Sequence, residues 1–297
     1  MTEAQPLPKF IADAFPFPRR RVETRHGGME CADTGGSGRP VVMVHGNPAW
    51  SYLYRKVMAG LKGSGLRLVA PDLLGFGTSF KPRDWRWHAL RRHGEALLDL
   101  VEELDLRDIV LVGQDWGGPV GTWMAAHAPE RVTGLLLANT AVLDPGSRWR
   151  TTAFHRFSHM PVVSEIAFRG LKFPVPWMHV VQGDRNSIGR AEKRAYAWPF
   201  RHLRDRAGPL ALARMVPNRP DHPTVPELKK TDRWFRGFTG PVEFVWGVKD
   251  PILGRQLRRH AEAHPGARVT ETQAGHFLQE EVPGELAAAV GRLVGKP

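Results

Sequence analysis

The chain has 297 residues, of which 42% are hydrophobic, a composition ordinary for a globular protein with a well-buried core. Its longest apolar runs, such as "VVMVHG" and "DIVLVG", are strand-sized, whereas a membrane span needs roughly 18 residues. Cys31 is the only cysteine, and the N-terminal segment lacks the apolar stretch of a signal peptide. We therefore expect a cytoplasmic protein with no intrachain disulfide and no membrane partner.

The net charge of +12 at pH 7 raises the question of a nucleic-acid partner. The basic residues are scattered along the chain in short groups: Arg19 to Arg21, Arg91 and Arg92, Arg148 and Arg150, and Arg258 and Arg259. No RRM, KH or zinc-finger pattern accompanies them. We interpret the charge as a solvated basic surface and expect no nucleic-acid partner.

Short apolar runs alternate with helix-length segments, which is typical of a mostly parallel sheet with helices on both faces. Eight strands are predicted. The first two form a hairpin, and the strands lie at 22–25, 29–32, 41–45, 66–70, 109–113, 135–139, 242–247 and 268–272. Helices are predicted at 90–106, 118–129 and 283–295, the first from apolar residues at helical spacing.

The alternation breaks after the sixth predicted strand, in a segment rich in Trp, Phe, Pro and Arg. The segment holds helical patterns at 147–160, 186–200 and 208–216 but no clear strand. An insertion at this point sits above the carboxyl ends of the strands, where open α/β sheets bind their ligands. We therefore predict a core domain of residues 1–140 and 220–297 and a helical cap domain of residues 141–219. An irregular surface excursion is the alternative.

The sequence "LVGQDWGGPVG" places Asp115 between Gly113 and Gly117 at the end of an apolar run. This is the pattern of a nucleophile elbow, in which a strand turns sharply into a helix around a residue that is usually serine. An aspartate after a strand, taken alone, is more simply a helix N-cap. The flanking glycines, which a tight elbow needs, favour Asp115 as a nucleophile.

Two further motifs complete the chain order of nucleophile, acid and histidine that α/β hydrolases share. Asp250 follows the strand in "VEFVWGVKDP", and His276 follows the last strand in "ETQAGHFLQEEVP". An ionised carboxylate displaces a leaving group from carbon and forms an ester without a general base. His276 is then free to activate the water that hydrolyses the ester, while Asp250 holds the imidazole.

The leaving group is expected to be an anion held by neutral donors. The indole N–H of Trp116 donates and cannot accept, and the side-chain amide of Asn47 in "VHGNPAWSYLYR" also offers hydrogens. The backbone N–H groups of Asn47 and Trp116 are the candidate oxyanion hole for ester hydrolysis. A packed core aromatic and a turn residue are the alternative interpretations of these two positions.

Five motifs together resemble the haloalkane dehalogenase family: "HGNPAWSYLYR", "APDLLGFGTSFKP", "GQDWGGPVG", "WGVKDP" and "AGHFLQEEVP". The resemblance covers nearly all of the predicted core and is weak in the insertion. It implies an α/β-hydrolase fold and hydrolytic dehalogenation with no cofactor and no metal. The implied partner is a small apolar halogenated substrate, and the implied product is a halide ion held by Trp116 and Asn47.

Members of this family differ in where the acid and the second halide donor lie. Some carry a glutamate after the strand that follows the elbow; here that position is Asn139, so the acid role falls to Asp250. Some use a tryptophan of the cap. Trp177 and Trp198 are candidates here, but Asn47 makes neither necessary. The combination resembles the subgroup with an Asp-His-Asp triad and an Asn-Trp halide pair.

An epoxide hydrolase with the same nucleophile is the nearest alternative, but ring opening needs proton donors, typically two cap tyrosines, and only Tyr196 lies in the insertion. Fluoroacetate-type dehalogenases usually show an arginine where this chain has Trp116. No G-x-S-x-G motif supports a serine esterase. A non-catalytic ligand-binding protein on the same fold is disfavoured by the complete residue set. The sequence does not specify the natural substrate or the oligomeric state.

Two further patterns predict no site. His260 and His264 lie four residues apart, but no zinc-protease signature accompanies them, so we interpret them as a solvated helix end. The segment "GFGTSF" lacks the remaining residues of a phosphate-binding loop and is interpreted as a turn after a strand.

Overall fold

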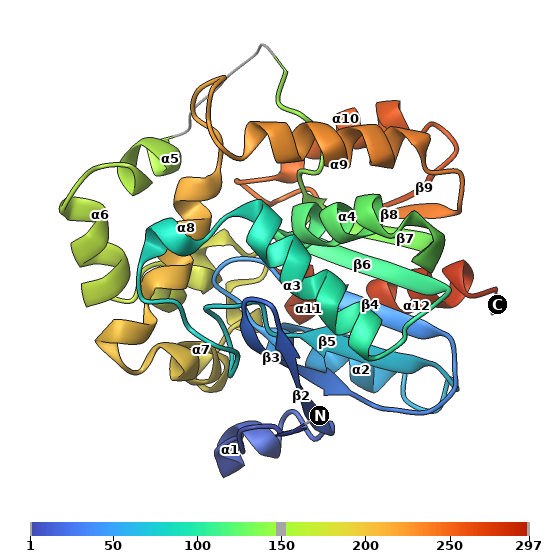
Figure 1. The fold of residues 1–297 in the computed structure, drawn as a ribbon, viewed down its shortest axis with the longest axis horizontal. Coiled ribbons are helices and arrows are strands. Elements are labelled where there is room, and N and C mark those ends of the chain that lie inside the picture. The colour runs from blue at the N-terminus through green and yellow to red at the C-terminus, as the bar shows by residue number, and fades with distance from the viewer. Residues whose placement is uncertain (1, 147–152, 296–297) are drawn as a thin grey trace.

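The core of the computed structural model, which describes residues 2–146 and 153–295, is a nine-stranded sheet of order β1-β2-β3-β5-β4-β6-β7-β8-β9 (Figure 1). The strands are β1 (Thr2–Glu3), β2 (Arg19–Thr24), β3 (Gly27–Asp33), β4 (Pro40–Val44), β5 (Arg67–Pro71), β6 (Ile109–Asp115), β7 (Val132–Thr140), β8 (Val242–Gly247) and β9 (Arg268–Thr272). The pairs β1–β2, β2–β3 and β3–β5 are antiparallel, and all other pairs in the sheet are parallel. The central strands β4, β6 and β7 are almost wholly buried, as expected for strands covered on both faces.

Two groups of helices cover the two faces of the sheet. In Figure 1, α3 (Leu90–Glu103) and α4 (Gly117–His127) lie in front of the strands and pack together, and α9 (Val225–Gly237) packs against α4. On the other face, α12 (Pro283–Leu293) packs against α2 (Arg55–Gly60) and α11 (Leu278–Glu281). The short helices α1 (Lys9–Ala12) and α10 (Leu257–Ala263) complete the core. Within the described ranges, no helix is long and apolar enough to cross a lipid bilayer.

The eight strands predicted from the sequence are confirmed, with boundaries that differ by a few residues, and α3, α4 and α12 confirm the three predicted core helices. The sheet has one strand more than predicted, because Thr2–Glu3 pairs with β2 at the edge. A two-residue strand has too few positions to show an alternating pattern. The "GFGTSF" segment is a turn, as predicted, with Gly75 and Gly77 at φ of 92° and 47°.

Between β7 and α9, the described residues form helices and no strand. The helices are α5 (Ala153–Ser158), α6 (Val163–Glu165), α7 (Arg190–Ala197) and α8 (Ala207–Met215), with a π-helical turn at Ile166–Gly170 and 3₁₀ turns that include Val175–Val181 and Leu203–Asp205. The first two predicted helical patterns contain α5 and α7, and the third overlaps α8 with a shift of one residue. Residues 147–152 of the first pattern lie outside the described residues. We call residues 141–219 the helical insertion; its helices form the left part of the molecule in Figure 1.

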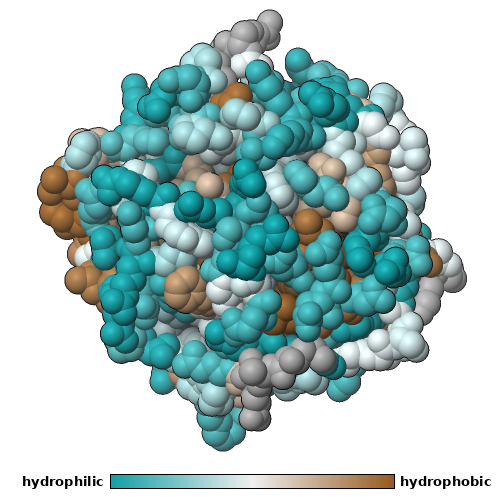
Figure 2. All heavy atoms as spheres, in the orientation of Figure 1, coloured by the Kyte–Doolittle hydropathy of each residue, from teal (hydrophilic) through white to brown (hydrophobic). Residues whose placement is uncertain are grey.

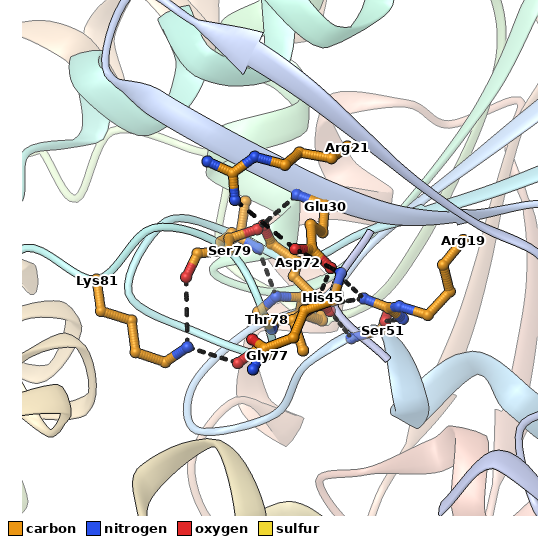
Figure 3. A network of polar contacts seen from close by, with 12 residues as sticks. Arg19, Arg21, Glu30, His45, Ser51, Asp72, Gly77, Thr78, Ser79 and Lys81 are labelled. Carbon is orange, nitrogen blue, oxygen red and sulfur yellow. Dashed lines mark hydrogen bonds and ion pairs between the residues drawn. The ribbon is translucent and has the colours of Figure 1, made fainter. Parts of the chain in front are cut away.

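A buried polar network fixes the loop that follows β5 (Figure 3). Asp72 accepts hydrogen bonds from the backbone N–H groups of Ser51 at 2.8 Å and Thr78 at 3.0 Å, and from Nη2 of Arg19 at 2.7 Å. The hydroxyl of Thr78 also donates to Glu30 at 2.6 Å. Burial acts to raise the pKa of Asp72, but Arg19 and these donors outweigh it, so the pKa lies below its ordinary value. The network ties β2 and β3 to the turn that follows β4.

Candidate active site

The chain reverses sharply between β6, which ends in Asp115, and α4, which begins at Gly117. Asp115 has a φ of 49°, a backbone conformation uncommon for a residue other than glycine. A Cβ atom at Gly117 would lie 1.9 Å from the carbonyl oxygen of Val44, and one at Gly46 would lie 2.4 Å from Cβ of Asp115. The elbow and the loop after β4 are therefore in direct contact, and only glycine fits at these two positions.

The carboxylate of Asp115 faces backbone N–H groups. The N–H of Asn47 donates to Oδ2 of Asp115 at 2.8 Å, and the hydroxyl of Thr140 donates to the carbonyl oxygen of Asp115 at 2.6 Å. Burial raises the pKa of Asp115 above its ordinary value, while His276 and the backbone N–H groups of Asn47 and Trp116 oppose the rise. The two backbone donors predicted for the oxyanion hole are thus directed at the carboxyl group of Asp115.

His276 and Asp250 form a buried pair at the carboxyl ends of β9 and β8, with 2.9 Å between Nδ1 and Oδ2. Since an ionised carboxylate only accepts, Nδ1 donates, and Nε2 carries the lone pair that can take a proton, with the amide nitrogen of Gln114 3.5 Å away. Burial acts to lower the pKa of His276, but the carboxylates of Asp250 and Asp115 outweigh it and raise the pKa. Burial acts to raise the pKa of Asp250, but His276 and the N–H of Ile252 outweigh it and lower the pKa. The structure therefore brings the three predicted triad residues together.

Asn139, at the end of β7, holds Asp250 in place. Its Nδ2 donates to Oδ2 of Asp250 at 2.8 Å and lies 3.2 Å from the carbonyl oxygens of Gly247 and Gly275. Its Oδ1 accepts from the N–H of Gly247 at 2.8 Å. In the sequence, Asn139 stood out only as the position where some members of the resembled family carry a glutamate. Its location at a strand end beside the elbow was the available signal for this role.

Both the core and the helical insertion hold the loop that carries His276. Gln114, the residue before the elbow aspartate, donates from Nε2 to the carbonyl oxygen of His276 at 3.0 Å. From the insertion, the carbonyl of Val181 accepts from the N–H of His276 at 2.9 Å, and Oε1 of Gln182 accepts from the N–H of Phe277 at 2.8 Å. The sequence carries no signal for the last two contacts, because they join segments nearly a hundred residues apart.

The side chains of Asn47 and Trp116 are the predicted halide donors. Nδ2 of Asn47 donates to the carbonyl oxygen of Pro209 in α8 at 3.0 Å. Since the amide nitrogen carries two hydrogens, one is left for another acceptor. The indole of Trp116 is largely buried, and among the described residues its Nε1 has no hydrogen-bond acceptor. Two neutral donors are therefore available beside Asp115.

Three aromatic residues of the insertion were candidates for the site: Trp177 and Trp198 as halide donors and Tyr196 as a proton donor. The structure gives each of them another environment. The side chain of Trp177 is 44% exposed, and Trp198 packs 6.3 Å from the ring of Trp50. Tyr196 is buried, and its hydroxyl donates to Oε1 of Glu280 at 2.5 Å. The same carboxylate is paired with the guanidinium of Arg55, so the phenol is enclosed in a buried ionic cluster.

The pair His260 and His264 forms no metal site, and groups of three or more His, Cys, Asp or Glu side chains suited to a metal ion are absent from the described parts of the chain. The interpretation of His260 as part of a solvated helix end is wrong. His260 is fully buried, its Nδ1 bonds the carbonyl oxygen of Gln256 at 2.8 Å, and its Nε2 accepts from the N–H of Val142 at 3.3 Å. Burial lowers its pKa to about 4, so it anchors α10 as a neutral imidazole.

Comparison with known proteins agrees with this geometry. Residues 39–161 match the family model of the alpha/beta hydrolase fold. A haloalkane dehalogenase from Mycolicibacterium paratuberculosis is 32% identical over 272 residues, which cover 90% of this chain and 88% of the relative. One from Mycobacterium marinum is 34% identical over 278 residues, covering 91% and 89%.

The chain belongs to the haloalkane dehalogenase family. The structure of haloalkane dehalogenase DpaA from Paraglaciecola agarilytica is similar along its whole length, with a TM-score of 0.82 at 26% identity and coverage of 99% of this chain and 98% of that one. The family and the α/β-hydrolase fold inferred from the sequence are thereby confirmed.

For this haloalkane dehalogenase family member, Asn139→Ala should lower the free energy of unfolding by about 2–4 kcal/mol, because it leaves several buried polar groups without partners. Urea denaturation measures the change. Asn186→Ala, at an exposed position of the insertion, is the matched control and should stay within about 0.5 kcal/mol of the wild type. A loss below about 1 kcal/mol at position 139 would show that Asp250 does not depend on this amide.

Proposed function

We propose that this protein hydrolyses haloalkanes to an alcohol and a halide ion through a covalent ester on Asp115. The observation that carries the proposal is the convergence of three elements. The Asp115 carboxylate lies at the elbow, 2.8 Å from the backbone N–H of Asn47, and the His276–Asp250 pair is buried beside it. The names of the relatives support the same reaction.

In the first step, Oδ of Asp115 attacks the carbon that bears the halogen. The new C–O bond forms as the C–halogen bond breaks, and the halide leaves with the bonding electron pair. No general base is needed, because the nucleophile is already ionised. The indole N–H of Trp116 and the free amide hydrogen of Asn47 stabilise the departing anion, and neither donor carries a charge that would retain it firmly.

In the second step, His276 takes a proton at Nε2 from a water molecule, and the resulting hydroxide attacks the ester carbonyl carbon of Asp115. The backbone N–H groups of Asn47 and Trp116 stabilise the oxyanion. Collapse breaks the bond between the carbonyl carbon and the alkoxy oxygen, and the alkoxide leaves as an alcohol with the proton from His276. Asp250 holds the imidazole and stabilises its charged form.

The helical insertion acts in this proposal as a cap that shapes the substrate pocket, with residues 1–140 and 220–297 as the core. Its contacts with the site support this division: α8 accepts a hydrogen bond from Asn47, and Val181 and Gln182 hold the loop of His276. The arrangement corresponds to an Asp-His-Asp triad with an Asn-Trp halide pair. The substrate is a small apolar haloalkane, and the protein acts in the cytoplasm without a cofactor.

Two of the three tyrosines, including the one in the insertion, are not available to protonate an epoxide oxygen. Opening an epoxide creates an alkoxide that needs an acidic hydroxyl close to it. The hydroxyl of Tyr196 is committed to Glu280, and that of Tyr54 donates to the carbonyl oxygen of Val44 at 2.9 Å. A leaving halide needs no such proton, so the site is better suited to dehalogenation.

His276→Phe should form the ester and fail to hydrolyse it. Incubation with 1-bromobutane should release about one bromide per enzyme and add the mass of a butyl group to the peptide that contains Asp115. The double variant Asp115→Ala/His276→Phe is the control and should release no bromide. Styrene oxide should not be turned over by the wild type. If His276→Phe neither turns over nor carries an adduct, the two-step scheme is wrong.

Bromide should bind at the site and quench tryptophan fluorescence in a saturable way. Asn47→Ala should weaken bromide binding by tenfold or more, because one hydrogen bond to a charged partner contributes about 1.5–3 kcal/mol. Trp116→Phe keeps an aromatic ring and removes the N–H, and it should lower the rate of halide release from the substrate to a similar degree. Asn186→Ala should bind bromide as the wild type does. Equal binding by Asn47→Ala would remove that side chain from the halide site.

The pKa of His276 should depend on both carboxylates. In the free enzyme, Asp250 and Asp115 raise it above 6.5, and esterification removes the charge of Asp115. Ester hydrolysis in a single turnover should therefore decline as the pH falls through a pKa lower than that of the free enzyme, because only neutral imidazole acts as a base.

NMR titration of His276 measures this dependence, with its resonance assigned from its loss in His276→Phe. Asp115→Ala should lower the pKa, and Asp250→Asn should lower it further, since Asp250 makes the larger contribution. The exposed residue Asp221 supplies the control variant Asp221→Asn. An unchanged pKa in Asp115→Ala would contradict the proposed electrostatic coupling.

A further inference from the structure

The helical insertion carries most of the large hydrophobic side chains that are exposed among the described residues. Among the described residues, twelve large hydrophobic side chains are exposed, and eight of them lie between residues 160 and 203. Those eight are Met160, Val162, Val163, Ile166, Leu171, Trp177, Val180 and Leu203. Figure 2 shows a hydrophobic area at the left edge of the molecule, where α6 lies in Figure 1. An apolar concentration of this kind on one segment indicates a contact surface and not random exposure.

A basic depression adjoins this apolar surface. The turn Leu203–Asp205 packs against the turn Ile166–Gly170, and together they border a shallow hollow of about 730 Å³. The hollow is lined by Arg169, Arg201, His202, Leu203, Arg204 and Arg206. Arg206 is buried beneath it and donates to the carbonyl oxygens of Phe200, Arg169 and Gly170, which fixes the two turns together. Arg201 and Arg204 are exposed.

The charge of the insertion is one-sided. Residues 153–206 contain ten Lys and Arg against four Asp and Glu, an excess of six in a chain whose net charge is +12. Three of the four carboxylates are already paired: Glu165 with Arg214, Glu192 with Arg55, and Asp205 with Arg204. The surface therefore offers guanidinium groups and apolar side chains but few unpaired carboxylates to complement them.

The combination of exposed arginines and apolar side chains favours one kind of binding partner over others. In a twofold contact with a second copy, this patch would face itself, so its excess of guanidinium groups would meet another excess, with Asp205 already paired with Arg204. Nucleic acid would satisfy the arginines but gains nothing from exposed Leu, Ile and Val side chains. An anionic lipid surface satisfies both, because its phosphates bind guanidinium groups and its acyl region takes up apolar side chains.

We propose that the face of the helical insertion formed by Val162, Ile166, Leu171, Leu203 and the basic depression docks on an anionic lipid bilayer. The apolar side chains enter the headgroup boundary, and Arg201 and Arg204 bind lipid phosphates. This surface was not apparent from the sequence, which contains no spanning segment and led us to expect no membrane partner. The proposal stands independently of the catalytic roles, because vesicle binding is measured without them.

The full-length protein should co-sediment with vesicles of 70% phosphatidylcholine and 30% phosphatidylglycerol and much less with phosphatidylcholine alone. Arg201→Glu/Arg204→Glu should reduce partitioning by roughly tenfold or more, since each arginine near an anionic surface contributes about fivefold. Leu171→Glu and Leu203→Glu should each reduce it severalfold. Binding of the wild type should weaken as the salt concentration rises.

Matched controls lie on the core. Arg255→Glu/Arg258→Glu makes the same charge change at two exposed arginines near α10, and Val269→Glu places a carboxylate at an exposed apolar position of β9. Both should partition nearly as the wild type does. Bromide release from 1-bromobutane and the unfolding temperature should be unchanged in all variants, which separates a failure of docking from a failure of folding or of the proposed function.

The alternatives give different results in the same experiments. Equal losses in the core and insertion charge variants would show a nonspecific effect of net charge and overturn the proposal. So would a dimer, measured by light scattering, that Leu171→Glu dissociates while no variant changes vesicle binding. Binding to duplex DNA that depends on Arg201 and Arg204 but not on Leu171 or Leu203, in the absence of vesicle binding, would identify a polyanion site instead.

Discussion

The contact between the first turn of α4 and the end of β4 is the constraint on which the site depends. It places Gly117 against the carbonyl of Val44 and Gly46 against Asp115, and at this distance no larger residue fits. The contact forces Asp115 into its positive φ and at the same time delivers the N–H of Asn47 to its carboxylate. Asp115 and the backbone donor of Asn47 are therefore positioned by backbone packing before any ligand binds, which is the condition for effective electrostatic stabilisation.

Much of the fold and site was predictable because both depend on strands. The strands β6 and β8 are buried on both faces and appear as continuous apolar runs, with Asp115 at the end of the first and Asp250 shortly after the second. His276 follows the half-exposed edge strand β9. Parallel strands end at the same edge, so residues that follow them meet even when they are far apart in the chain. The positions of these three residues could be inferred without knowing any side-chain contact.

The parts that were missed depend on contacts that carry no periodic signal. Asn139 differs from an ordinary strand-end residue only in what it touches, and Gln182 reaches the loop of His276 across the whole fold. The burial of His260 depends on the packing of α10 and not on its own helical pattern. The apolar face of the insertion combines residues from several short turns, so no single stretch of sequence shows it.

The buried cluster of Tyr196, Glu280 and Arg55 limits how this molecule admits a ligand. The phenol of Tyr196, from the insertion, donates to a core carboxylate that is already paired with Arg55, and all three groups are buried. Swinging the insertion outward as a rigid lid would break the hydrogen bond from Tyr196 and expose the ion pair of Arg55 and Glu280 to water. The insertion is therefore held to the core by a buried joint, and a ligand that enters or leaves without breaking this joint needs only local rearrangement of the short turns around it.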